Sequence, residues 1–315
     1  MRVTVLAVAL FSVMACGGGD DPPAGPDSSP LAMTTTAVDA ERTALATLFN
    51  EPALRALIPG TPNLQSAVAA SRPVHDHPAI LDPGTMTVVP PSLRGRLFVS
   101  NGMTWTGSVS PSAPANGTVI TMYESMPFGG GPAVGTLTII DSTAGALGVA
   151  SVTLRNVSGA VLLRARITES QAPNRIIGTA TIGTAPNPTA TLADTFDISA
   201  SRVAGRMSIG ATGGQWFLGQ PISEESRLTA ELVSRGAVLR AVTEPVTGGD
   251  STSFRLDGRF LGYFKGDTVL RAPSNTNAPA LVSAFARFAG NAPLPNFLSL
   301  AVSTILLIVI DTTSP

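Results

Sequence analysis

The hydrophobic pattern of the first part of the chain is helical. Leu45, Leu48 and Phe49 recur at a spacing of three and four residues, which places them on one face of a helix. Prolines interrupt this pattern at short intervals, so each helix must be brief. The spacing predicts three short helices, over residues 39–49, 52–58 and 63–70.

After Pro83 the pattern changes to an alternation of apolar and polar positions. Residues 161–168 show it most clearly, because Leu163 and Ile167 fall on one face while Arg164 and Arg166 fall on the other. Residues 254–260 alternate in the same way and are interpreted as another strand. Further runs predict strands over residues 85–89, 96–107, 117–125, 135–141, 148–156, 160–170, 175–183 and 189–199.

The joints between these runs decide how the strands pair. Residues 156–159, for example, are too few for a helical crossover, so neighbouring strands should pair antiparallel in a long meander. An open sheet of roughly ten to twelve strands tends to curl, split or close. We therefore predict an α+β fold that is mainly β, with the meander forming a curved sheet or partial barrel over residues 83–272.

The C-terminal part of the chain, residues 273–315, is expected to pack on this sheet. Residues 280–289 predict a short helix. Residues 297–310 form a mainly apolar run, shorter than the about 20 residues of a membrane-spanning helix, and we expect this run to be buried. Their β-branched residues leave a long strand open as the alternative to the buried helix that we favour.

The N-terminus carries a positive residue, Arg2, followed by an apolar run over residues 3–14. This run is too short for a membrane-spanning helix, which needs about 20 residues, and is typical of a signal peptide. Val13, Met14 and Ala15 then precede Cys16, which is the only cysteine of the 315 residues. An internal disulfide is therefore excluded, so the fold must be stabilised by packing.

The segment from Val13 to Cys16 resembles the lipobox of bacterial lipoprotein precursors, which ends in a small residue and a cysteine. The resemblance implies a signal peptide over residues 1–15, cleavage before Cys16 and lipidation of its thiol. Residues 16–30, rich in glycine and proline, would then form a flexible tether, with helices and a linker over residues 31–82. Gly17 in place of aspartate implies the outer membrane; its periplasmic or surface side stays open.

Charge and composition narrow the function classes. Charged residues make up 13% of the chain and the formal net charge is −1, with no basic block. Since phosphate backbones require clustered lysines and arginines, we expect no nucleic-acid partner. The sequence also contains no motif that predicts a cofactor.

The two histidines, His75 and His77, are the candidate metal ligands. In a strand, positions two apart share a face, so both imidazoles could reach one ion, with Asp82 adding an oxygen. Three nearby prolines instead favour an irregular linker, and two histidines do not complete a zinc site. A metal-dependent hydrolase that uses His75 and His77 is the alternative function.

Other candidate motifs have structural explanations. Residues 128–135 are glycine-rich but lack the spacing of a phosphate-binding loop, which favours a hairpin turn. Asp194 and Asp197 stand three apart in a predicted strand, so they should face opposite ways. Glu224 and Glu225 form a second pair without a catalytic pattern.

We therefore predict a non-enzymatic, membrane-anchored lipoprotein of the cell envelope with a structural or binding role. Acyl chains on Cys16 would contact the membrane, and a groove between sheet and helices could hold a lipid or another hydrophobic ligand. In shape this would resemble the half-barrel lipoprotein carriers of the periplasm. The mature chain otherwise resembles only uncharacterised β-rich lipoproteins of GC-rich bacteria, which implies no activity.

Overall fold

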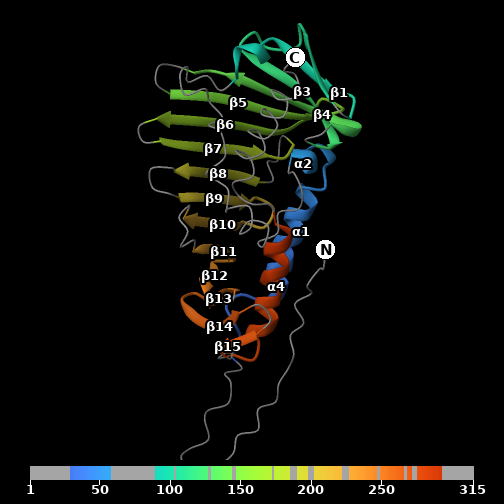
Figure 1. The fold of residues 1–315 in the computed structure, drawn as a ribbon. Coiled ribbons are helices and arrows are strands. Elements are labelled where there is room, and N and C mark those ends of the chain that lie inside the picture. Colours follow the sequence, from blue (N-terminus) through green and yellow to red (C-terminus); the bar gives the residue numbers. More distant parts are fainter. Residues whose placement is uncertain are drawn as a thin grey trace, which may run out of the picture.

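The computed structural model is dominated by one 15-stranded sheet with helices along one face (Figure 1). The residues that it describes are 29–57, 89–102, 104–126, 129–143, 147–171, 174–184, 190–197, 202–221, 227–246, 249–265, 268–271 and 275–292. The sheet does not close, because β2 and β15 lie at its two opposite edges. The predicted α+β, mainly β architecture with a curved meander sheet is confirmed.

The strands follow one another along the chain almost without interruption. Their bounds are β1 Arg96–Ser100, β2 Trp105–Val109, β3 Gly117–Ser125, β4 Gly130–Asp141, β5 Leu147–Asn156, β6 Val161–Gln171, β7 Asn174–Ile182, β8 Ala190–Asp197, β9 Arg202–Ile209, β10 Gly214–Pro221, β11 Leu228–Ser234, β12 Ala237–Val246, β13 Gly249–Leu256, β14 Arg259–Lys265 and β15 Thr268–Arg271.

From β3 to β15 every neighbouring pair is antiparallel, as short hairpin joints require. The other edge departs from this pattern. There β1 lies between β2 and β3, antiparallel to the first and parallel to the second. A meander alone therefore does not describe this edge.

The sheet has 15 strands, so the estimate of ten to twelve is wrong: β9 to β12 and β15 lie where no strand range was predicted, and two segments predicted as single strands are hairpins. Residues 96–107 divide into β1 and β2 at a turn in which the Thr104 amide donates to the Asn101 side chain at 2.9 Å. Residues 254–260 divide between β13 and β14 at Asp257 and Gly258, whose φ angles are 48° and 82°. Asp-Gly favours this positive-φ turn. Because Leu256 pairs with Arg259 and Arg255 with Phe260, Phe260 lies on the side of Arg255, so the single alternation predicted over residues 254–260 is wrong.

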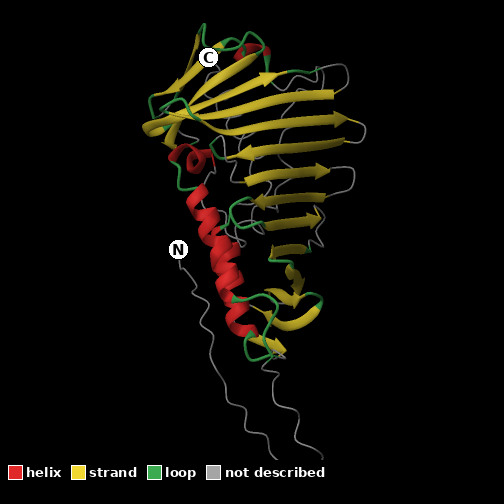
Figure 2. Cartoon of the chain, turned by 180° about the vertical axis from the view of Figure 1, so that it is seen from behind, coloured by secondary structure: helices red, strands yellow, loops and turns green. Residues whose placement is uncertain are grey.

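Three helices lie along the sheet as a column (Figure 2). They are α1 Thr35–Leu48, α2 Pro52–Leu57 and α4 Ala278–Asn291, and a short 3₁₀ helix, η2 Pro91–Leu93, precedes β1. Helix α1 begins one turn before the predicted start because the Thr34 hydroxyl caps it, accepting a hydrogen bond from the Ala37 amide at 3.2 Å. The helices predicted over residues 39–49, 52–58 and 280–289 are confirmed; residues 63–70 and 297–310 lie outside the described residues.

The core lies between the sheet and the helix column. Helix α2 covers β3 to β6, α1 packs against β9 and β11, and α4 packs against α1 and β14. Trp216 of β10 is fully buried, with its ring 6.1 Å from Phe285 and 5.1 Å from Phe288, both of α4. These edge-to-face contacts fix α4 on the sheet.

Alternation gives the sheet two chemically different faces. We call the side covered by the three helices the helix face; Leu137, Leu163 and Leu232 are buried there. The opposite side of β5 to β12 carries arginines, threonines and serines, and we call it the arginine face. This division is the one that the period of two predicts for a strand with one buried side.

Candidate functional site

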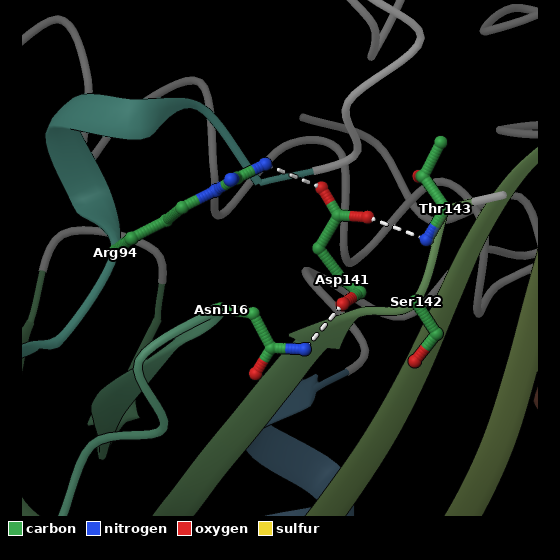
Figure 3. Close-up of a pocket in the computed structure, with 5 residues that line it drawn as sticks. All are labelled: Arg94, Asn116, Asp141, Ser142 and Thr143. Atoms are coloured by element: carbon green, nitrogen blue, oxygen red, sulfur yellow. Dashed lines mark hydrogen bonds and ion pairs between the residues drawn. The ribbon is translucent and has the colours of Figure 1, made fainter. Parts of the chain in front are cut away.

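A polar pocket of about 600 Å³ lies where the loop before β3 meets the end of β4 (Figure 3). Its lining residues are Arg94, Asn116, Asp141, Ser142 and Thr143. Arg94 directly follows η2, and Asp141 is the last residue of β4. Three separate segments of the chain therefore meet here.

Asp141 is the centre of the pocket. Its Oδ2 accepts hydrogen bonds from Arg94 Nη2 at 2.9 Å and from the Val89 amide at 3.3 Å. Its Oδ1 accepts one from the Thr143 amide at 2.9 Å, which closes a tight turn after the strand. The Asn116 side-chain amide also donates to the Asp141 carbonyl at 2.6 Å.

The electrostatics of Asp141 favour its charged form. Burial by itself raises the pKa of this carboxyl, but hydrogen bonds from Thr143 and Val89 and the charge of Arg94 together outweigh it, and the pKa is lowered. The carboxylate remains ionised near neutral pH and cannot supply a proton as a general acid.

The geometry of the pocket indicates a structural role. The Asp141 carboxylate faces Arg94 and Thr143 rather than the Ser142 hydroxyl, so Ser142 has no base in this group of residues (Figure 3). Arg94 also donates through Nε to the Val89 carbonyl at 3.0 Å. Arg94 and Asp141 therefore clamp the segment before β1 onto the end of β4.

A second carboxyl has a shifted pKa. Glu169 of β6 is buried on the helix face, and burial raises its pKa to about 7. By the strand register it lies between Gly148 and Ile176, neither of which carries a charge. The cause of the shift is therefore the loss of water.

The arginine face is a second candidate site and covers many strands. The register aligns Arg166 of β6 with Thr179, Ala193 and then Arg206 of β9. Arg206 in turn aligns with Phe217 of β10, and its guanidinium carbon lies 5.6 Å from the ring centre. Arg166 and Arg206 are both exposed and lie on one line across the strands, separated by Thr179 and Ala193; we call this line the arginine row.

The residues singled out from the sequence lie mainly elsewhere. Cys16, His75, His77 and Asp82 are outside the described residues, so lipidation and the metal site stay predictions. Among the residues that are described, no group of three or more His, Cys, Asp or Glu side chains could hold a metal ion.

The remaining motifs can be placed. Residues 128–135 include the turn from β3 into β4, where Ser125 pairs with Gly130, which confirms the hairpin interpretation. Asp194 and Asp197 both belong to β8; Asp194 lies on the helix face, and Asp197 lies on the arginine face and is paired with Arg175. The pair does face opposite ways, as predicted, while Glu224 and Glu225 fall outside the described residues.

Sequence reasoning missed the clamp and the arginine row for different reasons. Arg94 and Asp141 are 47 residues apart, and no local motif announces their contact. The beginning of the row can be predicted from the sequence, since Arg166 stands on the polar side of a clear strand. Its continuation to Arg206 depends on the register of β6 to β9.

Comparison with protein-family models, with curated proteins and with solved structures finds no match. Within the described part of the chain, no helix combines the length and apolar composition needed to cross a bilayer.

Proposed function

We propose that this chain is a lipid-anchored protein of the cell envelope, without enzymatic activity, that offers the arginine face of its sheet as a binding surface. The anchor is supported by the segment from Val13 to Cys16, which resembles a lipobox and contains the only cysteine. The outer membrane follows from Gly17, by the same resemblance.

The observation that carries the binding role is the contrast between the two faces of the sheet. On the helix face, Trp216, Phe254 and Leu232 pack against helices or one another and are buried. On the other face, Arg164 and Arg166 of β6 and Arg206 of β9 are exposed. A sheet that needs one face for its own core can use the second for recognition.

The hydrogen bonds to the Asp141 carboxylate support a non-enzymatic role of the pocket. Its carboxylate is engaged by Arg94, Val89 and Thr143, and each contact joins parts of the fold. We keep a hydrophobic ligand as part of the proposal. It would bind away from the contact of α4 with β10, because the side chains of Phe285 and Phe288 already pack against Trp216 there.

The proposed lipid anchor is tested by determining the chemical state of the mature N-terminus. We expect mass spectrometry of the full chain, expressed in a bacterium and extracted from membranes, to show a chain that begins at Cys16 and carries acyl chains. Cys16→Ala and the more conservative Cys16→Ser should both remain uncleaved and unacylated, because each removes the thiol. A mature chain that begins elsewhere and carries no lipid would refute the anchoring.

A further inference from the structure

We infer that the arginine face lies against a bilayer surface rich in anionic headgroups, the same bilayer to which Cys16 attaches the chain. This inference rests on the proposed lipid anchor and adds the partner that the exposed sheet face recognises. It follows from the placement of charges, from their pairing and from the point at which the tether joins the fold.

The arginines of strands β5 to β12 all lie on one face of the sheet, whereas the acidic residues of these strands lie on both faces. Every arginine within strands β5 to β12 lies on the arginine face: Arg155, Arg164, Arg166, Arg175, Arg202, Arg206 and Arg240. Over the same strands, Glu169 and Asp194 lie on the helix face and are buried. A chain with a formal net charge of −1 therefore presents a locally positive surface.

The acidic residues that share the arginine face are already neutralised. Asp197 accepts from Arg175 Nε at 2.7 Å, and Glu231 from Arg240 Nε at 2.6 Å. Glu244 at the end of β12 pairs with Arg227 at 2.8 Å. These pairs remove the negative charge that would otherwise repel an anionic surface, and they leave further arginines in excess.

Arg164 and Arg166 are the centre of this excess. Both are exposed on β6, and neither makes a hydrogen bond or ion pair within the part of the chain that the structure describes. Their strand neighbours Thr153, Thr181 and Thr179 are small and uncharged. Two adjacent guanidinium groups can therefore approach phosphate oxygens directly, and guanidinium geometry suits bidentate phosphate contacts.

The position of the tether makes a bilayer the fitting partner. The Asn275 side-chain amide donates to the Ser29 carbonyl at 3.0 Å, so the described chain begins beside the start of α4, near the β15 edge. The residues from Cys16 to Ser29 can span at most about 45 Å when fully extended. Strands are spaced about 4.8 Å apart, so β6 lies about 40 Å along the sheet from that edge.

With these dimensions, the sheet can lie along the membrane with β6 at the surface. Tethering also keeps the arginine face at a high effective concentration near the headgroups, so individually weak attractions suffice. Each arginine near an anionic surface strengthens association about fivefold, and salt screens the effect. A freely diffusing acidic protein would lack this advantage.

The experiment measures arginine accessibility on vesicles. The acylated full chain is reconstituted into vesicles of phosphatidylcholine alone or with one third phosphatidylglycerol, and arginines are labelled with phenylglyoxal and located by peptide mass spectrometry. We expect labelling of Arg164, Arg166 and Arg206 to fall at least about threefold on the anionic vesicles, and high salt to restore it. Arg55, exposed on α2 of the helix column, is the internal control and should label equally on both.

A double variant adds a second readout. Arg164→Gln with Arg166→Gln should weaken the protection of Arg206, whereas Arg55→Gln should leave that protection unchanged. If the chain is acylated and anchored but all arginines label equally on the two vesicle types, the present inference is overturned while the anchor stands. The inference is also overturned if the arginines are protected, relative to the chain in detergent, equally on neutral and on anionic vesicles. A chain that carries no acyl groups would overturn the proposed anchor as well.

Discussion

Glu41 gives a quantitative test of how α1 is fixed to the sheet. The residue is 2% exposed; its Oε1 accepts a hydrogen bond of 2.7 Å from the Ser234 hydroxyl, and its Oε2 accepts one from the Thr212 hydroxyl. Gly214 lies so close that a Cβ on it would stand 2.2 Å from Oε2. The carboxylate and this glycine therefore share one tightly filled space.

The expected energies follow from these contacts. Glu41→Ala removes two hydrogen bonds to a carboxylate, but it also removes the cost of burying that carboxylate. What remains is chiefly the buried Ser234 hydroxyl without its acceptor, so we expect a loss of about 2 kcal/mol in the free energy of unfolding. Gly214→Ala alone overpacks the same space and should lose about 1–3 kcal/mol.

The double variant distinguishes one shared space from two independent losses in the free energy of unfolding. In Glu41→Ala with Gly214→Ala, the new methyl group enters the space that the carboxylate has left. We expect the combined loss to be smaller than the sum of the single losses by about 1–2 kcal/mol. The assay is urea unfolding of the full chain, monitored by tryptophan fluorescence, since Trp216 is buried two residues after Gly214 in β10.

Gly178→Ala is the matched control. Its Cβ would stand 2.0 Å from the Asp194 carboxylate, on the helix face but three strands away from Gly214. Combined with Glu41→Ala it should show simple additivity. If the Glu41 and Gly214 variants were equally additive, the shared space inferred from the structure would be wrong.

Two further predictions concern carboxyl groups with shifted pKa values. The pKa of Asp141 is lowered, so its contribution to stability is complete above the ordinary value of 3.8 and is lost as the pH falls through the folded-state pKa. Asp141→Asn should therefore lose about 1–3 kcal/mol at pH 7, with the difference from the natural chain shrinking in acid; a difference that stays constant with pH would contradict this. The pKa of Glu169 is raised to about 7, so the natural chain should lose stability as the pH rises from 4.5 to 7, because the unfolded chain releases its proton first. Glu169→Gln should lack this decline in thermal unfolding at pH 4 and pH 8, and parallel behaviour of the two chains would rule out the assignment.

Much of the fold could be predicted because it depends on local patterns. Apolar spacing identified α2 and α4, and the period of two identified β3 to β8 within about one to five residues at their ends. The errors also had local causes. Asp257 and Gly258 form a two-residue turn within what was predicted as one strand, and the Thr34 cap extends α1 by one turn.

The candidate sites could be predicted only in part. Arg164 and Arg166 stand on the polar side of β6 in the sequence itself, because side chains alternate along a strand. The alignment of Arg166 with Arg206 requires the pairing of four strands, and the clamp between Arg94 and Asp141 requires β4 to end beside η2. No local propensity contains that information.

The sequence by itself determined the α+β, mainly β class, the antiparallel meander and the two faces of β6, because these follow from backbone periodicity and short connections. It also placed the only cysteine after an apolar run, where a lipid anchor is expected. Only the tertiary structure decided which side chains are neighbours. Ser234 contacts Glu41 across 193 residues, and Arg166 aligns with Arg206, because register and helix docking are set by packing over the whole sheet.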